Sequence, residues 1–241
     1  TDVVLKSILD GSIESRPDNT LLYVTSHDLR EPLRAIRSFT QLLSDRAGDR
    51  LDDVELGYLA RVVDGADRLN RLLEDVLMMS RAKQASEGTQ LVDAKIIARD
   101  VIRQFEVRIS ETQAVVEIVG ELPRIRVDPR WLRQSLFNLV GNALKFCGND
   151  EPPRVEIAAY LPESENAAVT GLVVRDRGPG IAPEHVERVF QLFQRAVGRK
   201  IEGTGAGLAI VRQISTRYGG DAWYEPRPGG GSQFVITFGI Q

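Results

Sequence analysis

The architecture of the second half of the chain is set by the run NLVGNALKF, residues 138–146. With 3.6 residues per helical turn, Asn138, Asn142 and Lys145 fall on one face of a helix expected from Arg130 to Phe146. The opposite face is apolar and supplies a core: Leu132, Leu136, Leu139 and Ala143. Asparagine is a poor helix former, its side-chain oxygen suits Mg²⁺, and a lysine neutralises phosphate charge. The polar face therefore indicates either a magnesium–phosphate site or plain solvation.

A second motif is the run VVRDRGPGI, residues 173–181, which reads as a strand that ends in an acid and two glycines. The Asp176 carboxylate can accept a hydrogen bond from an exocyclic amine. Gly178 and Gly180 let a backbone approach a flat ring closely. Taken alone, the motif fits an ordinary turn equally well.

A third motif, GTGAG at residues 203–207, runs directly into an apolar helix at residues 208–214. Unpaired N–H groups and the positive end of the helix dipole bind anions at such a place. Gly203, Gly205 and Gly207 therefore predict a phosphate-binding loop. The spacing matches neither the P-loop nor the dinucleotide fingerprint, so the nucleotide site belongs to a different kind of sheet.

The first third of the chain predicts a helical hairpin. Apolar residues recur every seven positions from about Asn19 to Ala47, and again between Leu56 and Leu77 after a polar break. Each helix has a wider apolar edge than one partner covers, which predicts that two hairpins pair in a dimeric four-helix bundle. A monomeric hairpin packed on the rest of the chain is the alternative.

The remaining pattern predicts an α+β sandwich, with helices on one face of a mixed sheet. A helix is expected near Ala94 to Ile109, and another ends at Tyr218. Strands are expected at residues 114–119, 155–160, 171–175, 221–224 and 233–238.

The composition makes several classes of partner less expected. The 31 basic and 34 acidic residues are interspersed and give a net charge of −3, so no footprint for nucleic acid or an anionic membrane is present. No stretch approaches the roughly 20 apolar residues of a membrane helix. The single cysteine, Cys147, forms no internal disulfide, and we expect a reducing, cytoplasmic location.

The order of the three motifs closely resembles the Bergerat-type ATP-binding domain shared by histidine kinases, type II topoisomerases, ninety-kilodalton heat-shock chaperones and MutL repair proteins. Residues 138–146 resemble its N box, residues 176–180 its G1 box and residues 203–207 its G2 box. Phe190 and Phe193 resemble its F box. The resemblance implies an ATP site.

The run SHDLREPL, residues 26–33, resembles the H box of sensor histidine kinases, in wording closest to the phytochrome-like group. On the heptad of the first helix, His27 falls on the outward face. The resemblance implies that His27 accepts a phosphoryl group from ATP, while Asp28 orients the imidazole and takes up its proton. Pro32 inside this helix should cost about 3 kcal/mol or bend it beside His27.

The resemblance also implies a role for each nucleotide-site residue. Asn142 ligates Mg²⁺ with help from Asn138, Lys145 contacts phosphate, and Asp176 binds the adenine amine. The glycines of the G1 and G2 boxes surround the nucleotide: Gly178, Gly180, Gly203, Gly205 and Gly207. The implied partners are a second copy of the chain and the receiver domain of a response regulator, which takes the phosphoryl group on an aspartate.

Four parts of the chain follow from these patterns. We expect residues 1–18 to connect to an upstream sensor or signalling region, and residues 19–83 to form the dimerisation and phosphotransfer domain. Residues 84–92 are expected to be a linker, and residues 93–241 the catalytic ATP-binding domain.

Some residues depart from the family pattern. Arg177 stands where the G1 box usually has asparagine, which puts the usual role of that position in doubt. Glu31 stands four residues after His27, where many kinases have a Thr or Asn that aligns a water for receiver dephosphorylation. We therefore expect weak phosphatase activity. Arg195 either reaches the γ-phosphate or is a solvated lid residue, and His185 is a surface residue without an assigned role.

Two other classes compete with a kinase. A degenerate, non-catalytic dimeric adaptor would bind a receiver domain but transfer no phosphate. An ATPase clamp of the topoisomerase or chaperone type would have no use for an outward histidine on a helical bundle. The stimulus, the cognate regulator and the choice between transfer within or across subunits are not encoded in these patterns.

Overall fold

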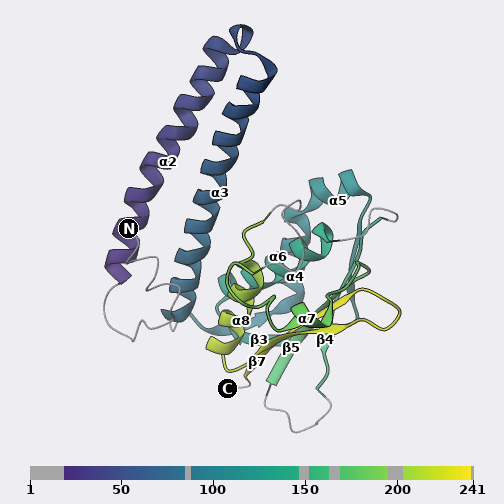
Figure 1. Ribbon diagram of the computed structural model, residues 1–241. Helices are drawn as coiled ribbons and strands as arrows, with labels where there is room; N and C mark the ends of the chain where they lie inside the picture. Colours follow the sequence, from purple (N-terminus) through teal and green to yellow (C-terminus); the bar gives the residue numbers. More distant parts are fainter. Residues whose placement is uncertain (1–18, 85–87, 147–151, 163–168, 195–202, 240–241) are drawn as a thin grey trace. The chain divides into compact units, whose positions relative to one another are not determined.

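The structure is a computed structural model that describes residues 19–84, 88–146, 152–162, 169–194 and 203–239. The chain divides into two compact units, residues 1–73 and residues 74–241 (Figure 1). Each unit is described by itself. Cys147 and Arg195 lie outside the described residues.

The first unit is a hairpin of two helices, as predicted. Helix α2 spans Asn19–Ala47, a 3₁₀ turn follows at Gly48–Arg50, and α3 spans Asp53–Gln84, with its residues from 74 onward counted in the second unit. A capping box starts α3: Asp52 Oδ1 accepts the Glu55 N–H at 2.8 Å, and Glu55 Oε2 accepts the Asp52 N–H at 2.9 Å. Helix α2 runs without interruption through Pro32.

A broad apolar edge of this hairpin is left exposed within the single chain. On α2 the exposed side chains include Leu29, Ile36, Phe39, Leu42 and Leu43, and on α3 they include Val54, Tyr58, Val62 and Leu69. Phe39 is 71% exposed, which is far more than a core position allows. The hairpin therefore has more apolar surface than its two helices cover.

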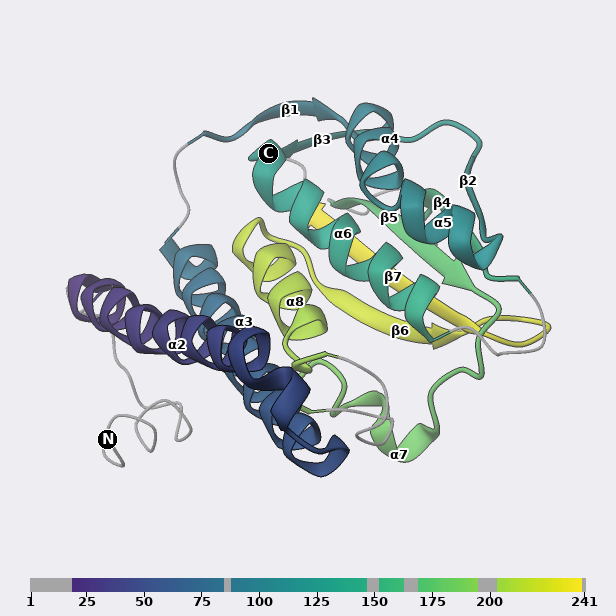
Figure 2. The same cartoon turned by 90° about the horizontal axis from the view of Figure 1, so that it is seen from above.

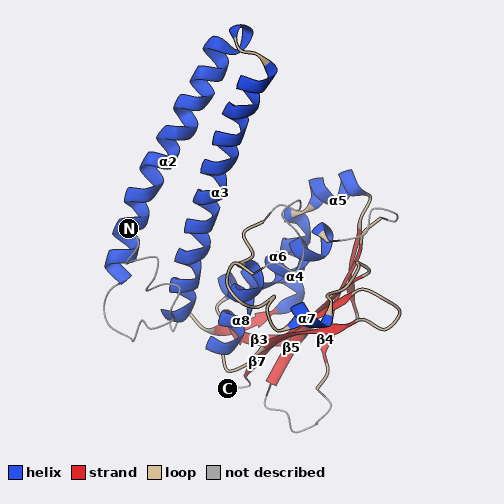
Figure 3. Ribbon diagram, viewed as in Figure 1, coloured by secondary structure: helices blue, strands red, loops and turns tan. Residues whose placement is uncertain are grey.

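The second unit is built on a five-stranded sheet in the order β2-β4-β5-β7-β6. Figure 3 draws its strands in red. Strands β2 and β4 are parallel, and the other neighbours are antiparallel. The strands span Val115–Val119 (β2), Arg154–Tyr160 (β4), Val169–Asp176 (β5), Ala222–Pro226 (β6) and Ser232–Gly239 (β7). A separate antiparallel pair consists of β1, Gln90–Asp93, and β3, Arg124–Val127.

Helices lie over one face of this sheet, as Figure 2 shows for α4, α6 and α8. The helices span Ala94–Gln104 (α4), Glu106–Thr112 (α5), Pro129–Lys145 (α6), Pro183–Val186 (α7) and Gly207–Arg217 (α8). The core lies between the two layers, where Leu136 of α6, Ile157 of β4 and Ile236 of β7 are fully buried. The predicted α+β sandwich is confirmed.

Helix α6 has a strong start. Asp128 caps it, because the carboxylate accepts the Arg130 N–H at 2.9 Å, and Pro129 occupies the first turn. Asp128 is 2% exposed, and its carboxylate also pairs with the Arg130 guanidinium at 2.6 Å. The hydrogen bonds from the Arg130 side chain hold the pKa of Asp128 below its ordinary value, against the raising effect of burial. These interactions therefore anchor the first turn of α6, the helix that carries the polar face.

Two sequence-based predictions of secondary structure differ from the structure. The helix predicted from Ala94 to Ile109 is broken at Phe105, whose ring stacks on Phe137 with centroids 4.7 Å apart. Packing of this half-buried ring against α6 favours the break, which no local sequence pattern predicted. In addition, the chain expected as a linker already enters β1 at Gln90, and β3 was not predicted.

Over the described residues, none of the helices combines the length and the apolar character needed to cross a lipid bilayer.

Candidate functional site

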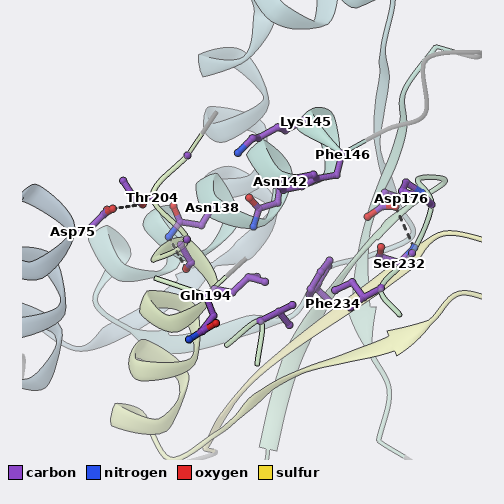
Figure 4. A pocket seen from close by; sticks show the side chains of 18 residues that line it. Asp75, Asn138, Asn142, Lys145, Phe146, Asp176, Gln194, Thr204, Ser232 and Phe234 are labelled. Carbon is purple, nitrogen blue, oxygen red and sulfur yellow. Dashed lines mark hydrogen bonds between the residues drawn. The ribbon is translucent and has the colours of Figure 1, made fainter. Parts of the chain in front are cut away.

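A cavity of about 240 Å³ opens in the second unit among α6, the turn after β5, the loop before α8, and β7 (Figure 4). This volume is several times the roughly 30 Å³ that one water occupies, so the cavity can admit part of an organic ligand. Most residues predicted for the nucleotide site line it: Asn138, Asn142, Lys145, Asp176, Gly180, Gly203, Gly205 and Gly207.

Asp176 is the buried acid of this cavity, with 4% of its surface exposed at the end of β5. Its Oδ1 accepts backbone N–H bonds from Gly178 at 2.8 Å and from Ser232 at 3.1 Å. Burial raises the pKa of the Asp176 carboxyl, although these hydrogen bonds and the charge of Arg227 lower it. A buried, oriented carboxylate of this kind favours a ligand that brings its own hydrogen-bond donor.

The glycines after Asp176 allow two close approaches. Gly178 does not line the cavity, but a Cβ there would lie 2.5 Å from the Phe146 carbonyl oxygen at the end of α6. Gly180 has a φ of +75°, which non-glycine residues rarely adopt. The turn therefore packs closely against the end of α6, and its Gly180 lines the cavity beside Asp176.

The polar face of α6 forms one wall of the cavity. Asn142 lies between Asn138 and Lys145, as Figure 4 shows. The Asn138 amide nitrogen donates to the Gly207 carbonyl at 3.1 Å, while its oxygen accepts from Gln134 at 3.1 Å. Asn138 thus ties α6 to the first residue of α8, a connection that the sequence reasoning did not anticipate.

The loop before α8 forms the opposite wall. Gly203 and Gly205 have φ values of +138° and +82°. No side chain caps α8, and the Ala206 N–H donates to the Thr204 hydroxyl at 3.3 Å. A helix N-terminus without a side-chain cap, preceded by a glycine loop, is suited to bind an anion.

Lys145 brings positive charge to this wall. Its ammonium lies 4.7 Å from the centroid of the Phe146 ring, and a Cβ on Gly203 would lie 2.5 Å from Nζ. The lysine and the glycine loop are therefore in direct contact, so both can bind the same anionic group.

Sequence reasoning missed several residues of the cavity: Asp75, Gln194, Thr204, Ser232 and Phe234. Asp75 accepts a hydrogen bond from the Thr204 hydroxyl and so adds negative charge beside the glycine loop. Ser232 and Phe234 reach the cavity because β7 pairs with β5. Thr204 lies inside the GTGAG motif but was assigned no role. No local motif marks the other four residues, since their position depends on strand pairing and on packing of distant segments.

A divalent cation would depend on few protein ligands here. Among the described residues, no cluster of three or more His, Cys, Asp or Glu side chains can hold a metal ion. Asn142 supplies an amide oxygen on a wall that faces the anion-binding loop. This donor set fits Mg²⁺, which takes most of its ligands from phosphates and water.

The predicted phosphoacceptor region lies in the first unit. Helix α2 carries residue 27, but the side chain of His27 is outside the described part of the structure. Asp28 and Glu31 are exposed on the same helix. In the second unit Arg177 is exposed, Phe190 is buried, and His185 is half-buried in the short helix α7.

Comparisons with known families match both units. Residues 127–241 match the family described as histidine kinase-, DNA gyrase B- and HSP90-like ATPases, and residues 18–85 match the His Kinase A phospho-acceptor domain. The chain belongs to the histidine kinase family. This kinase core therefore combines an ATPase-type domain with a phosphoacceptor-type hairpin, in agreement with the resemblance found from the sequence motifs.

Relatives of this histidine kinase include phytochrome-like proteins. It is 33% identical over 219 residues to phytochrome-like protein Cph1 of Synechocystis, an alignment that covers 90% of the chain and 28% of Cph1. It is also 33% identical to histidine protein kinase DivJ of Caulobacter vibrioides, over 89% of the chain and 36% of DivJ. The chain thus spans about a third or less of the length of these relatives.

Solved structures of histidine kinases are similar to this chain over most of its length. Full-length ShkA in complex with AMPPNP superimposes with a TM-score of 0.68 at 29% identity, over 91% of this chain and 45% of ShkA. The Acinetobacter baumannii histidine kinase AdeS gives a TM-score of 0.61 at 25% identity, over 89% of this chain and 98% of AdeS.

Proposed function

We propose that this histidine kinase core uses Mg-ATP to phosphorylate its own His27 and then passes the phosphoryl group to an aspartate of a response regulator. The observation that carries the proposal is one cavity with a buried carboxylate, Asp176, and a glycine-rich helix N-terminus. Such a cavity fits a ligand with a base that carries an exocyclic amine at one end and a polyphosphate at the other.

The nucleotide is placed by the chemistry of each wall. The adenine amine donates to the Asp176 carboxylate, and the absence of side chains at Gly178 and Gly180 leaves space for the ring. The phosphates bind the N–H groups between Gly203 and Gly207 and the ammonium of Lys145. The complex of ShkA with AMPPNP, an ATP analogue, supports a nucleotide in this fold.

Mg²⁺ would be held by the Asn142 side chain together with phosphate oxygens and water, with Asn138 as a second amide on the same face. When bound, the ion neutralises charge on the transferring phosphoryl group. Asn138 also keeps α6 and α8 at a fixed separation through its bond to Gly207.

The transfer itself needs mainly positioning and charge neutralisation, because its transition state is loose. A nitrogen of neutral His27 attacks the γ-phosphorus, the new N–P bond forms, and the P–O bond to ADP breaks. The Asp28 carboxylate orients the imidazole and takes up the proton that the ring loses. An aspartate of the receiver domain then attacks the same phosphorus and releases His27.

We infer that two copies of the chain associate through the hairpin at residues 19–83, and that residues 93–241 act as the ATP-binding domain. The exposed apolar edges of α2 and α3 support this association, since a second hairpin would cover them. The single cysteine supports a reducing, cytoplasmic location.

The proposal is tested by incubating the chain with Mg-ATP labelled at the γ-phosphate, and then adding candidate receiver domains. We expect labelled chain, and we expect the label to move to a receiver. Asn142→Ala should reduce labelling to background because Mg²⁺ loses its protein ligand. The fold should survive, because the apolar face of α6 is unchanged, and a thermal unfolding curve verifies this.

An unlabelled native chain that still binds a receiver domain would contradict the kinase and support the adaptor. Full labelling of a folded Asn142→Ala variant would contradict the assignment of Asn142.

A further inference from the structure

The hydroxyl of Tyr224 reaches the turn after β5 from the edge strand β6, although β7 lies between β5 and β6 in the sheet. Tyr224 lies on β6 with 9% of its surface exposed, and its hydroxyl oxygen accepts the Ile181 N–H at 3.1 Å. Ile181 and the preceding Gly180 line the cavity, whereas Tyr224 lies behind them. The hydroxyl is therefore not available to a ligand, but it holds a wall that is.

The Tyr224 ring is fixed independently of this bond. It packs against Phe234 with ring centroids 5.6 Å apart and planes at 60°, and the two residues are register partners on β6 and β7. Phe234 in turn packs against Phe190 at 6.4 Å. Because the ring is buried in an aromatic cluster, the hydroxyl has little freedom to move away from Ile181.

The hairpin of β6 and β7 also contacts Asp176 directly, through two hydrogen bonds and one close backbone approach. The Ser232 N–H donates to Oδ1 of Asp176 at 3.1 Å, and the Arg227 guanidinium donates to the Asp176 carbonyl at 3.3 Å. A Cβ on Gly231 would overlap that carbonyl oxygen. These contacts hold Asp176 itself, but none of them reaches the turn beyond Gly178.

The Tyr224 hydroxyl adds a contact between the hairpin of β6 and β7 and the last residues of the turn, Gly180 and Ile181. A Cβ on Gly180 would lie 3.4 Å from both the Tyr224 hydroxyl and the Gly231 carbonyl oxygen, so the turn is packed directly on the hairpin there. Gly180 has a positive φ, and a glycine turn without a second attachment has considerable conformational freedom.

We propose that Tyr224 is a positioning residue for the nucleotide base: its hydroxyl fixes Gly180 and Ile181 in the conformation that leaves room for the ring beside Asp176. The proposal rests on the proposed function, because it assumes that the base lies at the Asp176 end of the cavity. Tyr224 touches neither the base nor the phosphates, so its effect is confined to the base end.

The test is Tyr224→Phe, which removes one oxygen and keeps the aromatic cluster. Because the variant loses one hydrogen bond, its Kd for adenosine and for ADP should be about two- to tenfold higher than that of the native chain. Adenosine and ADP should lose affinity by the same factor, because the phosphate wall is unchanged. The matched control is Tyr160→Phe on β4, whose ring packs on Trp223 at 5.3 Å and lies outside the cavity lining.

A second readout follows the hydrogen bond directly, without nucleotide. In protein labelled with ¹⁵N-isoleucine, exchange of the Ile181 amide hydrogen should be about two- to tenfold faster in Tyr224→Phe than in Tyr160→Phe or the native chain. The thermal midpoint shows that each variant is folded.

Unchanged Ile181 exchange, or faster exchange with unchanged affinity for adenosine, would overturn the role of Tyr224. A loss of affinity for ADP but not for adenosine would overturn it as well. If the native chain bound neither ligand, the proposed function itself would fall, and Ile181 exchange would still report whether the hydrogen bond exists.

Discussion

At the scale of single residues, Asp176 carries the greatest consequence for ligand binding. Its Oδ1 already accepts two backbone N–H groups, so an asparagine oxygen can keep both bonds. Asp176→Asn should therefore remain folded while it loses the carboxylate that we propose accepts the adenine amine. We expect ADP affinity to fall by about 10- to 150-fold, which corresponds to loss of one charge-assisted hydrogen bond of roughly 1.5–3 kcal/mol. Isothermal titration with ADP measures this change.

Asp176 also gives the native chain a dependence of stability on pH that Asp176→Asn lacks. Burial raises the pKa of Asp176 in the folded chain above its ordinary value of 3.8, so the folded state binds more protons than the unfolded state between those two values. The native chain therefore loses stability as the pH rises through this interval, and Asp176→Asn does not. The variant should be the more stable protein at pH 7, and the difference should vanish below pH 3.8.

Urea unfolding of both proteins between pH 3 and pH 8 measures the difference, which cancels the titration of all other groups. A variant that is less stable than the native chain at pH 7 would show that the ionised carboxylate stabilises the fold and that its pKa is lowered rather than raised.

At the scale of elements, helix α6 has one face in the core and the other in the site, and the cap at Asp128 stabilises this helix. Asp128→Ala removes the acceptor of the Arg130 N–H and should lower the free energy of unfolding by about 0.5–2 kcal/mol. Because the pKa of Asp128 is lowered in the folded state, the stability it contributes is present above 3.8 and is lost as the pH falls below that value. Asp128→Asn, which retains a cap, should lose less.

Chemical denaturation at pH 7 and at pH 3 compares the three proteins. Equal stability of the native chain and Asp128→Ala at pH 7 would mean that the start of α6 is held by its apolar face alone.

The helices and strands also show how much of the fold local sequence patterns predict. The seven-residue repeat predicted both helices of the hairpin, and the three glycine- and asparagine-containing motifs predicted most of the cavity lining. Strands β1 and β3 were not predicted, since each has only four residues and pairs across a separation of more than 30 residues in the chain. The break at Phe105 depends on the Phe137 ring, which a local pattern does not contain.

The same reason explains the functional residues that were missed. Ser232 on β7 and Tyr224 on β6 are distant in sequence from the Asp176 turn, which they reach through the Ser232 N–H and the Tyr224 hydroxyl. Asp75 contacts Thr204 although 129 residues separate them. Motif recognition identifies residues that bind a ligand within one segment, but residues that support those segments from elsewhere need the folded structure.

At the scale of the whole molecule, the apolar edge of the hairpin predicts self-association. Phe39 of α2 is 71% exposed in the single chain and shares its stripe with Ile36 and Leu43. Phe39→Glu should convert the dimer to monomer, because a charge would be buried in the interface. The matched control is Val107→Glu on α5, where a side chain that is 72% exposed belongs to the other unit. Light scattering at micromolar concentration measures the mass.

The native chain and Val107→Glu should have the mass of two chains, and Phe39→Glu the mass of one. A monomeric native chain would contradict the four-helix bundle, and a dimeric Phe39→Glu would show that association uses another surface.

We propose that this chain, with an ATPase-type domain and a phosphoacceptor-type hairpin, phosphorylates itself on His27. The most direct measurement is to incubate the chain with Mg-ATP, digest it at neutral pH and locate the phosphoryl group by tandem mass spectrometry. We expect one phosphoryl group on His27 that survives base and is lost in acid, as a phosphoramidate requires, and no such group in His27→Gln. An acid-stable phosphoryl group on a serine or threonine, or an unchanged phosphorylation of His27→Gln, would contradict it.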